Sequence, residues 1–417
     1  MDALRSQAKK IIKVGRLWDG LGGSPQEAMA VVVEGGRIAL VARQAELSRS
    51  EDPGVEVLDF GDATLLPGLI DCHTHTNMPG TGLSVDQVHW DGDDIHLLEG
   101  VKSARMALES GVTTMRDNGG WNNVVFSLKE GIRREIVPGP RIVTSGNPVT
   151  ITGGHCWMMG SEADGVDGVR VAVRRLIKDG ADFIKVMTSG GTTRGSMPER
   201  AAYTLEELKA IVEEAHLRGR LVAGHAIATQ SIANCLDAGV DMIIHCNFME
   251  PDGTERFDPK IAERIADSGS WVNPTLHVRK AATLKLEEKR DRGELTLEEE
   301  KALSANLERV DRRKEVCSQL ISCGVRVIGG SDCGWGAYPF GQFHHELRAM
   351  MEAGMSTAQA LTSGTRDAAD ALGLLDQVGT IEAGKEADLL VVNGDPSRDI
   401  DDLSRVVAVF REGIRVK

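Results

Sequence analysis

The sequence predicts an α/β protein: a (β/α)8 TIM barrel with a small β-sandwich domain that the N- and C-terminal segments form together. From residue 65 to residue 374, short apolar segments alternate about eight times with stretches of helical periodicity. Residues 1–64 and 375–417 instead contain short β-branched runs separated by turn residues. An open, doubly wound parallel sheet would give a similar alternation and is the alternative fold.

The expected elements follow this division. In the N-terminal segment we expect strands at 9–14, 28–34, 37–43 and 55–58, with a hairpin turn at residues 34–37. In the barrel we expect strands at 68–71, 113–116, 141–144, 183–187, 221–223, 242–244, 270–273 and 325–328. Strand-like sequence returns at 379–392 and 406–413.

Residues 279–314 are dominated by Glu, Lys and Arg and lie in the loop after the seventh expected barrel strand. We interpret this insertion as a helical hairpin. It is either a solvated helix pair held by charge pairs one turn apart, or a lid or oligomer contact, because loops at that end of a barrel surround the active site.

Composition excludes several functional classes. The 48 Lys and Arg against 62 Asp and Glu give a net charge of −14, which makes nucleic acid a poor partner. The N-terminus has no apolar signal region, and no uncharged apolar stretch of about 18 residues occurs, so we expect neither secretion nor a membrane partner. Seven cysteines without a C-x-x-C pair indicate a reducing compartment, and we expect a cytoplasmic enzyme.

His73 and His75 end the apolar run that begins at Gly68. With a strand period of two, both imidazoles leave the backbone on the same side, which faces the cavity at the C-terminal end of a barrel strand. Two neutral imidazoles close together suit a metal such as zinc. An isolated His-x-His pair is as often structural, so a metal site requires further ligands.

Four later strand ends provide them: Lys185, His225, His245 and Asp332 each stand at the C-terminal edge of an apolar segment. Each has an ordinary alternative on its own, such as a core histidine, a buried paired lysine or a helix N-cap aspartate. Converging on one face of one barrel, the six residues together predict a metal centre.

This set of residues and its order resemble the amidohydrolase superfamily. The resemblance covers most of the chain, because residues 66–75 and 379–392 also look like the family. The segments around the site are most similar to the imidazolonepropionase-related and prolidase-like branch and to bacterial amidohydrolases that cleave xenobiotic amides, ureas and carbamates. The supporting segments are 113–117, 151–155, 185–191 and 203–216.

The resemblance implies a binuclear metal centre. His73, His75 and Asp332 would bind the more buried ion, and His225 with His245 the more exposed one. Zinc is the expected metal, although cobalt, manganese and iron suit the same ligands.

The resemblance also implies that CO2 carboxylates Lys185 to a carbamate that bridges the two ions, with a hydroxide completing the bridge. A carbamate offers two anionic oxygens where an amine offers one donor, which lowers the repulsion between the cations. Asp332 would take the proton of the attacking hydroxide and pass it to the leaving amine.

Four residues are candidates for contact with substrate. In peptidase-like members of the family, a histidine after the third strand and a tyrosine after the fourth contact the substrate, and the matching residues are His155 and Tyr203. His155 would be catalytic by donating to the substrate carbonyl or carboxylate; packing within the loop is its alternative. Arg194 would pair with an anion and Trp335 would wall an apolar pocket, whereas Tyr203 could instead anchor the core and Arg194 lie on the surface.

These observations predict a homo-oligomeric, binuclear metal-dependent amidohydrolase with a small-molecule substrate. It would cleave an amide-type C–N bond of an N-acyl amino acid, a dipeptide or an aryl amide. One alternative is a xenobiotic hydrolase of ureas or carbamates on the same site, and another is a catalytically silent scaffold barrel, although such scaffolds typically lose ligands. Ester, lactone or deamination chemistry is a further possibility, against which Lys185 argues because deaminating relatives usually lack the bridging lysine.

Overall fold

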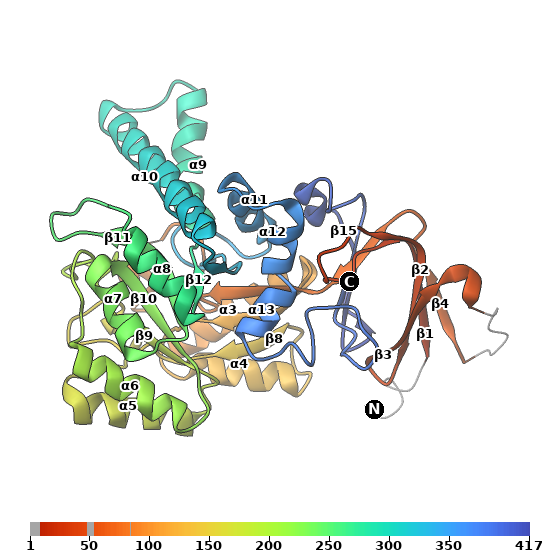
Figure 1. The fold of residues 1–417 in the computed structure, drawn as a ribbon, viewed down its shortest axis with the longest axis horizontal. Helices are drawn as coiled ribbons and strands as arrows, with labels where there is room; N and C mark the ends of the chain where they lie inside the picture. Colours follow the sequence, from red (N-terminus) through yellow and green to blue (C-terminus); the bar gives the residue numbers. More distant parts are fainter. Residues whose placement is uncertain (1–8, 48–53, 84) are drawn as a thin grey trace.

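The computed structural model describes residues 9–47, 54–83 and 85–417 (Figure 1). The terminal segments form one eight-stranded sheet, and the rest of the chain places eight parallel strands among helices. Figure 1 shows the terminal sheet at one end of the molecule, with the C-terminus beside it.

The terminal sheet joins segments from the two ends of the chain. Its order is β16-β15-β14-β5-β1-β2-β3, with β4 beside β1. The strands are β1 (Lys10–Leu17), β2 (Gln26–Glu34), β3 (Arg37–Arg43), β4 (Glu56–Asp59), β5 (Thr64–Pro67), β14 (Leu389–Val392), β15 (Val406–Arg411) and β16 (Ile414–Arg415). The predicted hairpin turn is confirmed, because Gly35 and Gly36 connect β2 to β3 with φ of +57° and +78°.

One apolar cluster draws on strands across this sheet. It combines side chains of β1 and β2, such as Ile12 and Val31, with Leu389 of β14 and Phe410 of β15. β5 pairs with both β1 and β14 and so connects the N-terminal strands to the C-terminal ones. The sheet therefore extends to Pro67, a few residues past the expected boundary at residue 64.

The eight predicted barrel strands are all present and parallel to their neighbours. β6 (Leu69–Thr74), β7 (Val112–Asp117) and β8 (Arg141–Thr144) form one sheet. A second sheet contains β9 (Ile184–Met187), β10 (Val222–Ala228), β11 (Met242–Met249), β12 (Trp271–Asn273) and β13 (Arg326–Val327).

Hydrogen bonds connect the two parallel sheets at both of their edges. Between the β8 and β9 segments, the amide of Asp182 donates to Thr144 O over 2.8 Å. Between the segments of β6 and β13, the amide of Cys72 donates to Gly329 O over 3.1 Å. This arrangement brings the C-terminal ends of β6 and β13 together, where His73, His75 and Asp332 are located.

Helices alternate with the parallel strands. They are α2 (Val85–Val88), α3 (Asp93–Glu109), α4 (Val124–Arg133), α5 (Gly165–Asp179), α6 (Leu205–His216), α7 (Thr229–Ala238), α8 (Pro259–Ser268), α11 (His344–Glu352), α12 (Thr357–Ser363) and α13 (Arg366–Ala371). No helix in the described part of the chain is long and apolar enough to cross a membrane.

The charged segment after β12 contains α9 (His277–Asp291) and α10 (Leu297–Ser322), which project together from the molecule in Figure 1. Thr296 begins α10 with a capping box, in which its hydroxyl accepts from the amide of Glu299. Helix α10 also has a buried face, made by side chains one turn apart that include Val310, Arg313 and Cys317. The hairpin is therefore packed on the rest of the protein along part of its length.

Candidate active site

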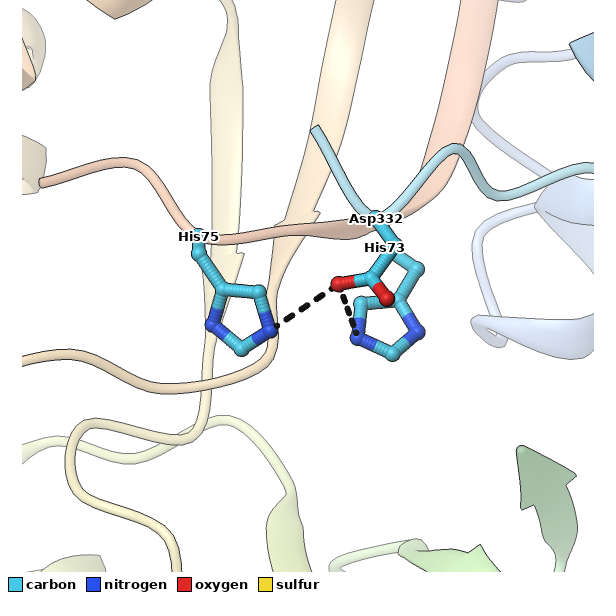
Figure 2. Close-up of side chains that lie close together, drawn as sticks. All are labelled: His73, His75 and Asp332. Atoms are coloured by element: carbon cyan, nitrogen blue, oxygen red, sulfur yellow. Dashed lines mark ion pairs between the residues drawn. The ribbon is translucent and has the colours of Figure 1, made fainter. Parts of the chain in front are cut away.

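The first predicted ligands meet where β6 ends. All residues of β6 are buried, and the strand period turns His73 and His75 to the same side. Their Nε2 atoms lie 3.5 Å and 3.3 Å from Oδ1 of Asp332 (Figure 2). The three side chains offer ligand atoms that all lie within 4.8 Å of one another, which suits a divalent cation with imidazole and carboxylate ligands.

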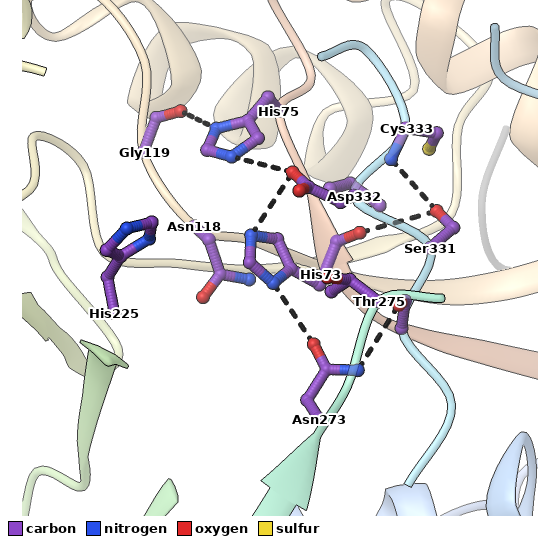
Figure 3. A network of polar contacts seen from close by, with 12 residues as sticks. His73, His75, Asn118, Gly119, His225, Asn273, Thr275, Ser331, Asp332 and Cys333 are labelled. Atoms are coloured by element: carbon purple, nitrogen blue, oxygen red, sulfur yellow. Dashed lines mark hydrogen bonds and ion pairs between the residues drawn. The ribbon is translucent and has the colours of Figure 1, made fainter. Parts of the chain in front are cut away.

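Hydrogen bonds fix which nitrogen of each imidazole faces the cavity. Nδ1 of His73 lies 3.0 Å from Oδ1 of Asn273, and Nδ1 of His75 lies 2.7 Å from Gly119 O (Figure 3). The Asn273 amide is itself oriented, because its nitrogen donates to two backbone carbonyls. Since both Nδ1 atoms face oxygen acceptors, they carry the protons, and both Nε2 atoms keep their lone pairs for a metal ion.

Three residues around the cavity have unusual backbone conformations. His245, Thr275 and Asp332 have φ of +68°, +49° and +61°, in the left-handed region that residues other than glycine seldom adopt. The amide of Asp332 donates to His73 O over 2.7 Å, which holds this turn against β6. Strained residues are common at functional sites, and these three lie within β11 or in the segments after β12 and β13.

A second group of imidazoles faces the first across the cavity. The rings of His225 and His245 are 4.6 Å apart, and those of His155 and His225 are 4.5 Å apart. Nε2 of His225 faces Gly190 O at 3.2 Å, and Nδ1 of His245 faces the Thr275 hydroxyl at 2.7 Å.

The two nitrogens left over by these bonds are close together. Nδ1 of His225 and Nε2 of His245 lie 3.0 Å apart, and two nitrogen ligands of one tetrahedral zinc ion are about 3.3 Å apart. This distance is close to the spacing of two imidazole nitrogens bound to one cation. Imidazole nitrogen is also a suitable ligand type for such a cation.

The imidazole of His155 is buried, and the hydroxyl of Thr193 contacts it. The Thr193 hydroxyl accepts from the amide of Cys156 at 3.0 Å and lies 2.8 Å from Nδ1 of His155. The hydroxyl can therefore donate to Nδ1 while it accepts from the Cys156 amide, and in that arrangement the ring proton is on Nε2. Burial, followed by the charges of Lys185 and His75, lowers the pKa of His155 to about 3. A Cβ on Gly191 would lie 2.5 Å from Nε2, so only glycine leaves room for this ring.

Lys185 of β9 is 1% exposed, which makes it one of the largest fully buried side chains in the protein. Burial lowers the pKa of Lys185 to about 7, although the Asp332 charge opposes this shift. A larger fraction of its amine is therefore neutral near pH 7 than for an exposed lysine. Within the described ranges, no hydrogen bond or ion pair holds this amine.

One cavity of about 230 Å³ brings most of the predicted site residues together. The predicted residues that line it are His73, His75, His155, Lys185, His225, His245, Asp332 and Trp335. His73 and His75 lie at the C-terminal end of β6, and the others lie within β9, β10 and β11 or in the loops after β8 and β13. The sequence predicted Lys185 at the C-terminal edge of its strand, but it is the second residue of β9 and not its last.

Two predicted substrate residues lie elsewhere. Tyr203 is 3% exposed and packs in the main apolar core, where its hydroxyl donates to Ala163 O over 3.0 Å. Arg194 is exposed, two residues beyond Thr192, which does line the cavity. Their side chains are absent from the lining of this cavity, so the structure favours the core anchor for Tyr203 and the surface position for Arg194.

Sequence reasoning missed two arginines in the cavity wall: Arg279 of α9 and Arg313 of α10. Burial, and next the charge of Arg279, lower the pKa of Arg313 to about 9. A signal was available for Arg313, because it interrupts the apolar face of α10 between Val310 and Cys317. No comparable pattern marks Arg279.

The chain is similar to known hydrolases along most of its length. The chain is 27% identical to an ochratoxinase of Aspergillus niger, over 94% of this chain and 82% of that protein. It is 25% identical to an imidazolonepropionase of Rhizobium rhizogenes, over 93% of this chain and 92% of that protein. A solved structure of a Xaa-Pro dipeptidase with bound methionine in its active site superposes with a TM-score of 0.85 at 28% identity, covering 98% of this chain and 100% of the other.

The family model of the amidohydrolase family matches residues 64–416, which includes every strand and helix from β5 onward. The resemblance predicted from the ligand motifs is confirmed, as is the similarity to imidazolonepropionases and prolidase-like proteins. The chain belongs to the amidohydrolase family and is a hydrolase that acts on C–N bonds.

Proposed function

We propose that this protein is a binuclear metal-dependent amidohydrolase that cleaves an amide-type C–N bond of a small molecule. One observation supports this above all: a single cavity is lined by four imidazoles, one lysine and one carboxylate at the predicted ligand positions, with His155 beside them. Groups of this kind and number suit two divalent cations better than one.

The ligands divide into two sets by their contacts. His73, His75 and Asp332 would hold one ion, and His225 and His245 the other. The buried, unpaired amine of Lys185 would form the bridging carbamate with CO2. Two such cations, when bound, lower the pKa of a water molecule toward neutrality and polarise a carbonyl group.

The protein's own groups would complete the reaction. Asp332 would accept a proton from the attacking water and transfer it to the leaving nitrogen, so that the amide yields a carboxylic acid and an amine. His155 would donate from Nε2 to the substrate carbonyl oxygen and stabilise the charge that develops on it. Thr193 would keep the proton on that nitrogen.

An N-acyl amino acid, a dipeptide or an aryl amide is the proposed substrate class. The relative that is named a Xaa-Pro dipeptidase supports a dipeptide-like substrate. A urea or carbamate on the same site is the second candidate, favoured by the apolar part of the lining, which includes Met187, Ile227 and Val278. A silent scaffold is disfavoured because all six ligand positions keep metal-binding side chains.

The proposal also covers the architecture of the chain and its cellular compartment. We propose that the two parallel sheets close into a (β/α)8 barrel over 65–374 and that segments 1–64 and 375–417 form a sandwich domain. The seven cysteines are all unpaired, which supports the reducing cytoplasm as the setting. A homo-oligomer stays a prediction, which light scattering in solution would check.

Elemental analysis together with a hydrolysis panel tests the proposed function. The panel contains dipeptides, N-acyl amino acids, anilides, phenylureas and carbamates, each assayed before and after chelation. We expect about two metal ions per chain and cleavage that chelation abolishes and metal with bicarbonate restores. His225→Asn should lower the metal content, whereas His216→Asn on the exposed face of α6 should not. A metal-replete protein that cleaves no member of the panel would favour the scaffold.

A further inference from the structure

The cavity continues into a second cleft that the proposed reaction does not use. This cleft has a volume of about 500 Å³ and shares Thr192, Ile227 and Arg279 with the metal-binding cavity. Its remaining wall includes Arg309 and Arg312 of α10. The hairpin of α9 and α10 thus forms a wall common to both spaces.

The charge of this wall is predominantly positive. Apart from Lys185 and Asp332, which belong to the proposed metal centre, the charged residues lining the two spaces are four arginines and two glutamates. These are Arg279, Arg309, Arg312, Arg313, Glu255 and Glu308. Among the residues that the structure describes, none of the four arginines is within ion-pair distance of either glutamate.

Arg313 is fixed in place by the protein. Its Nη2 lies 2.8 Å from the Asn247 amide, in the orientation that presents the amide oxygen, and its Nη1 donates to Thr275 O at 3.5 Å. Its buried Nε has no hydrogen-bond partner among the described residues. An arginine held so close to the proposed metal ligand His245 maintains positive potential at this end of the cavity.

Of the two arginines that no described residue engages, Arg279 and Arg309, only Arg279 lines both spaces. It stands at the junction of the two spaces, and no hydrogen bond or ion pair to another described residue engages its guanidinium. Burial, and then repulsion by Arg309, lower its pKa, so its present environment disfavours the charge. An anionic group beside Arg279 would relieve that repulsion and supply the missing hydrogen-bond partner.

We propose that Arg279, supported by Arg313, binds a carboxylate on the amine portion of the substrate. The preferred substrates are then N-acyl amino acids and dipeptides with a free carboxylate, and neutral aryl amides and ureas are poor substrates. This inference rests on the proposed hydrolysis of an amide at the metal centre, and it assigns substrate selection to the α9–α10 hairpin.

Paired probes that differ only in charge test the inference. N-benzoyl derivatives of Gly, Ala, Leu, Phe and Pro are each compared with the corresponding carboxamide, which contains the same acyl–nitrogen bond. We expect the metal-loaded enzyme to favour the carboxylate member by about 10- to 100-fold in kcat/KM, as for a hydrogen bond to a charged group. Calorimetry of the same probe pairs binding to the Asp332→Asn variant should give a similar ratio of Kd values between carboxamide and carboxylate.

Arg279→Met should remove this preference by weakening the carboxylate member alone, and Arg279→Lys should restore part of it. Arg290→Met is the matched control, because Arg290 is an exposed residue of the same helix outside both spaces. Equal use of both members by the wild type, or an equal loss for both members in Arg279→Met, would overturn the inference.

The two proposals fail in different ways. Chelator-sensitive hydrolysis without a carboxylate preference would retain the amidohydrolase and overturn the role of Arg279. Selective binding of carboxylates without hydrolysis would retain that role and contradict the proposed reaction. A chain that neither binds nor hydrolyses any probe would overturn both.

Discussion

Replacing Thr275 by valine should weaken metal binding at His245 without disturbing the fold. Thr275 is fully buried, and its hydroxyl is the group that faces Nδ1 of His245, at 2.7 Å. Valine has nearly the same shape, so the substitution removes the hydrogen bond and leaves little cavity. In the metal-free protein, the ring can move its proton to Nε2 and donate to His225, which lies 3.0 Å away. A bound metal ion takes Nε2 and forces the proton onto Nδ1, where valine offers no acceptor.

The penalty therefore applies to the metal-bound state. An unsatisfied buried donor costs about 1–3 kcal/mol, which corresponds to about 5- to 140-fold weaker metal binding at about 1.4 kcal/mol per tenfold. Metal content would be measured after dialysis against graded chelator concentrations, and thermal unfolding of the metal-free chains would verify the fold. Thr275→Ser keeps the hydroxyl and should behave like the wild type. If Thr275→Val retained both ions at the same chelator concentrations as the wild type, the reasoning would be refuted.

Two further substitutions separate chemistry from structure. Asp332→Asn should keep most of its metal and lose about 100-fold or more in kcat, because the amide cannot shuttle a proton. Elemental analysis and kinetics on the same preparation would check this. Retained turnover in a metal-replete variant would exclude the proton shuttle. Tyr203→Phe should leave kcat/KM nearly unchanged and lower the free energy of unfolding by about 1 kcal/mol through loss of the bond to Ala163 O; denaturant titration would measure the loss, and a large rise in KM would instead return Tyr203 to the substrate site.

The positions of the parallel strands could be predicted because each is a short apolar run followed by a helix. The boundary between β5 and β6 could not be predicted, because residues 64–72 form nearly one apolar run in the sequence. The structure divides this run after Pro67, so that β5 joins the terminal sheet and β6 begins at Leu69. The division depends on pairing with β1 and β14, which lie far away in sequence.

The ligand candidates could be predicted for a geometric reason: the C-terminal ends of parallel strands meet at one face, so polar residues at those ends converge. No such rule predicts where residues on loops and inserted helices will lie. Tyr203 opens a helix, and only the tertiary packing shows that its hydroxyl is used by Ala163. Arg279 lies in a strongly charged segment, and its position in the cavity wall depends on how the hairpin docks.

Arg313 connects the metal centre to the hairpin, and its substitution should affect both. Most groups in the cavity belong to one of two regions. The proposed metal ligands lie in or after the parallel strands, and Arg279 lies on the hairpin. Arg313 differs because it donates to the carbonyl of Thr275, whose hydroxyl orients His245, and because its charge, after burial and His73, lowers the pKa of His245. We therefore expect Arg313→Met to change metal affinity as well as carboxylate preference, and its effect on metal affinity to be non-additive with Thr275→Val. Arg279→Met combined with Thr275→Val should be additive. Chelator titrations of the single and double variants would measure both couplings, and additivity for Arg313 would show that the hairpin and the metal centre are energetically separate.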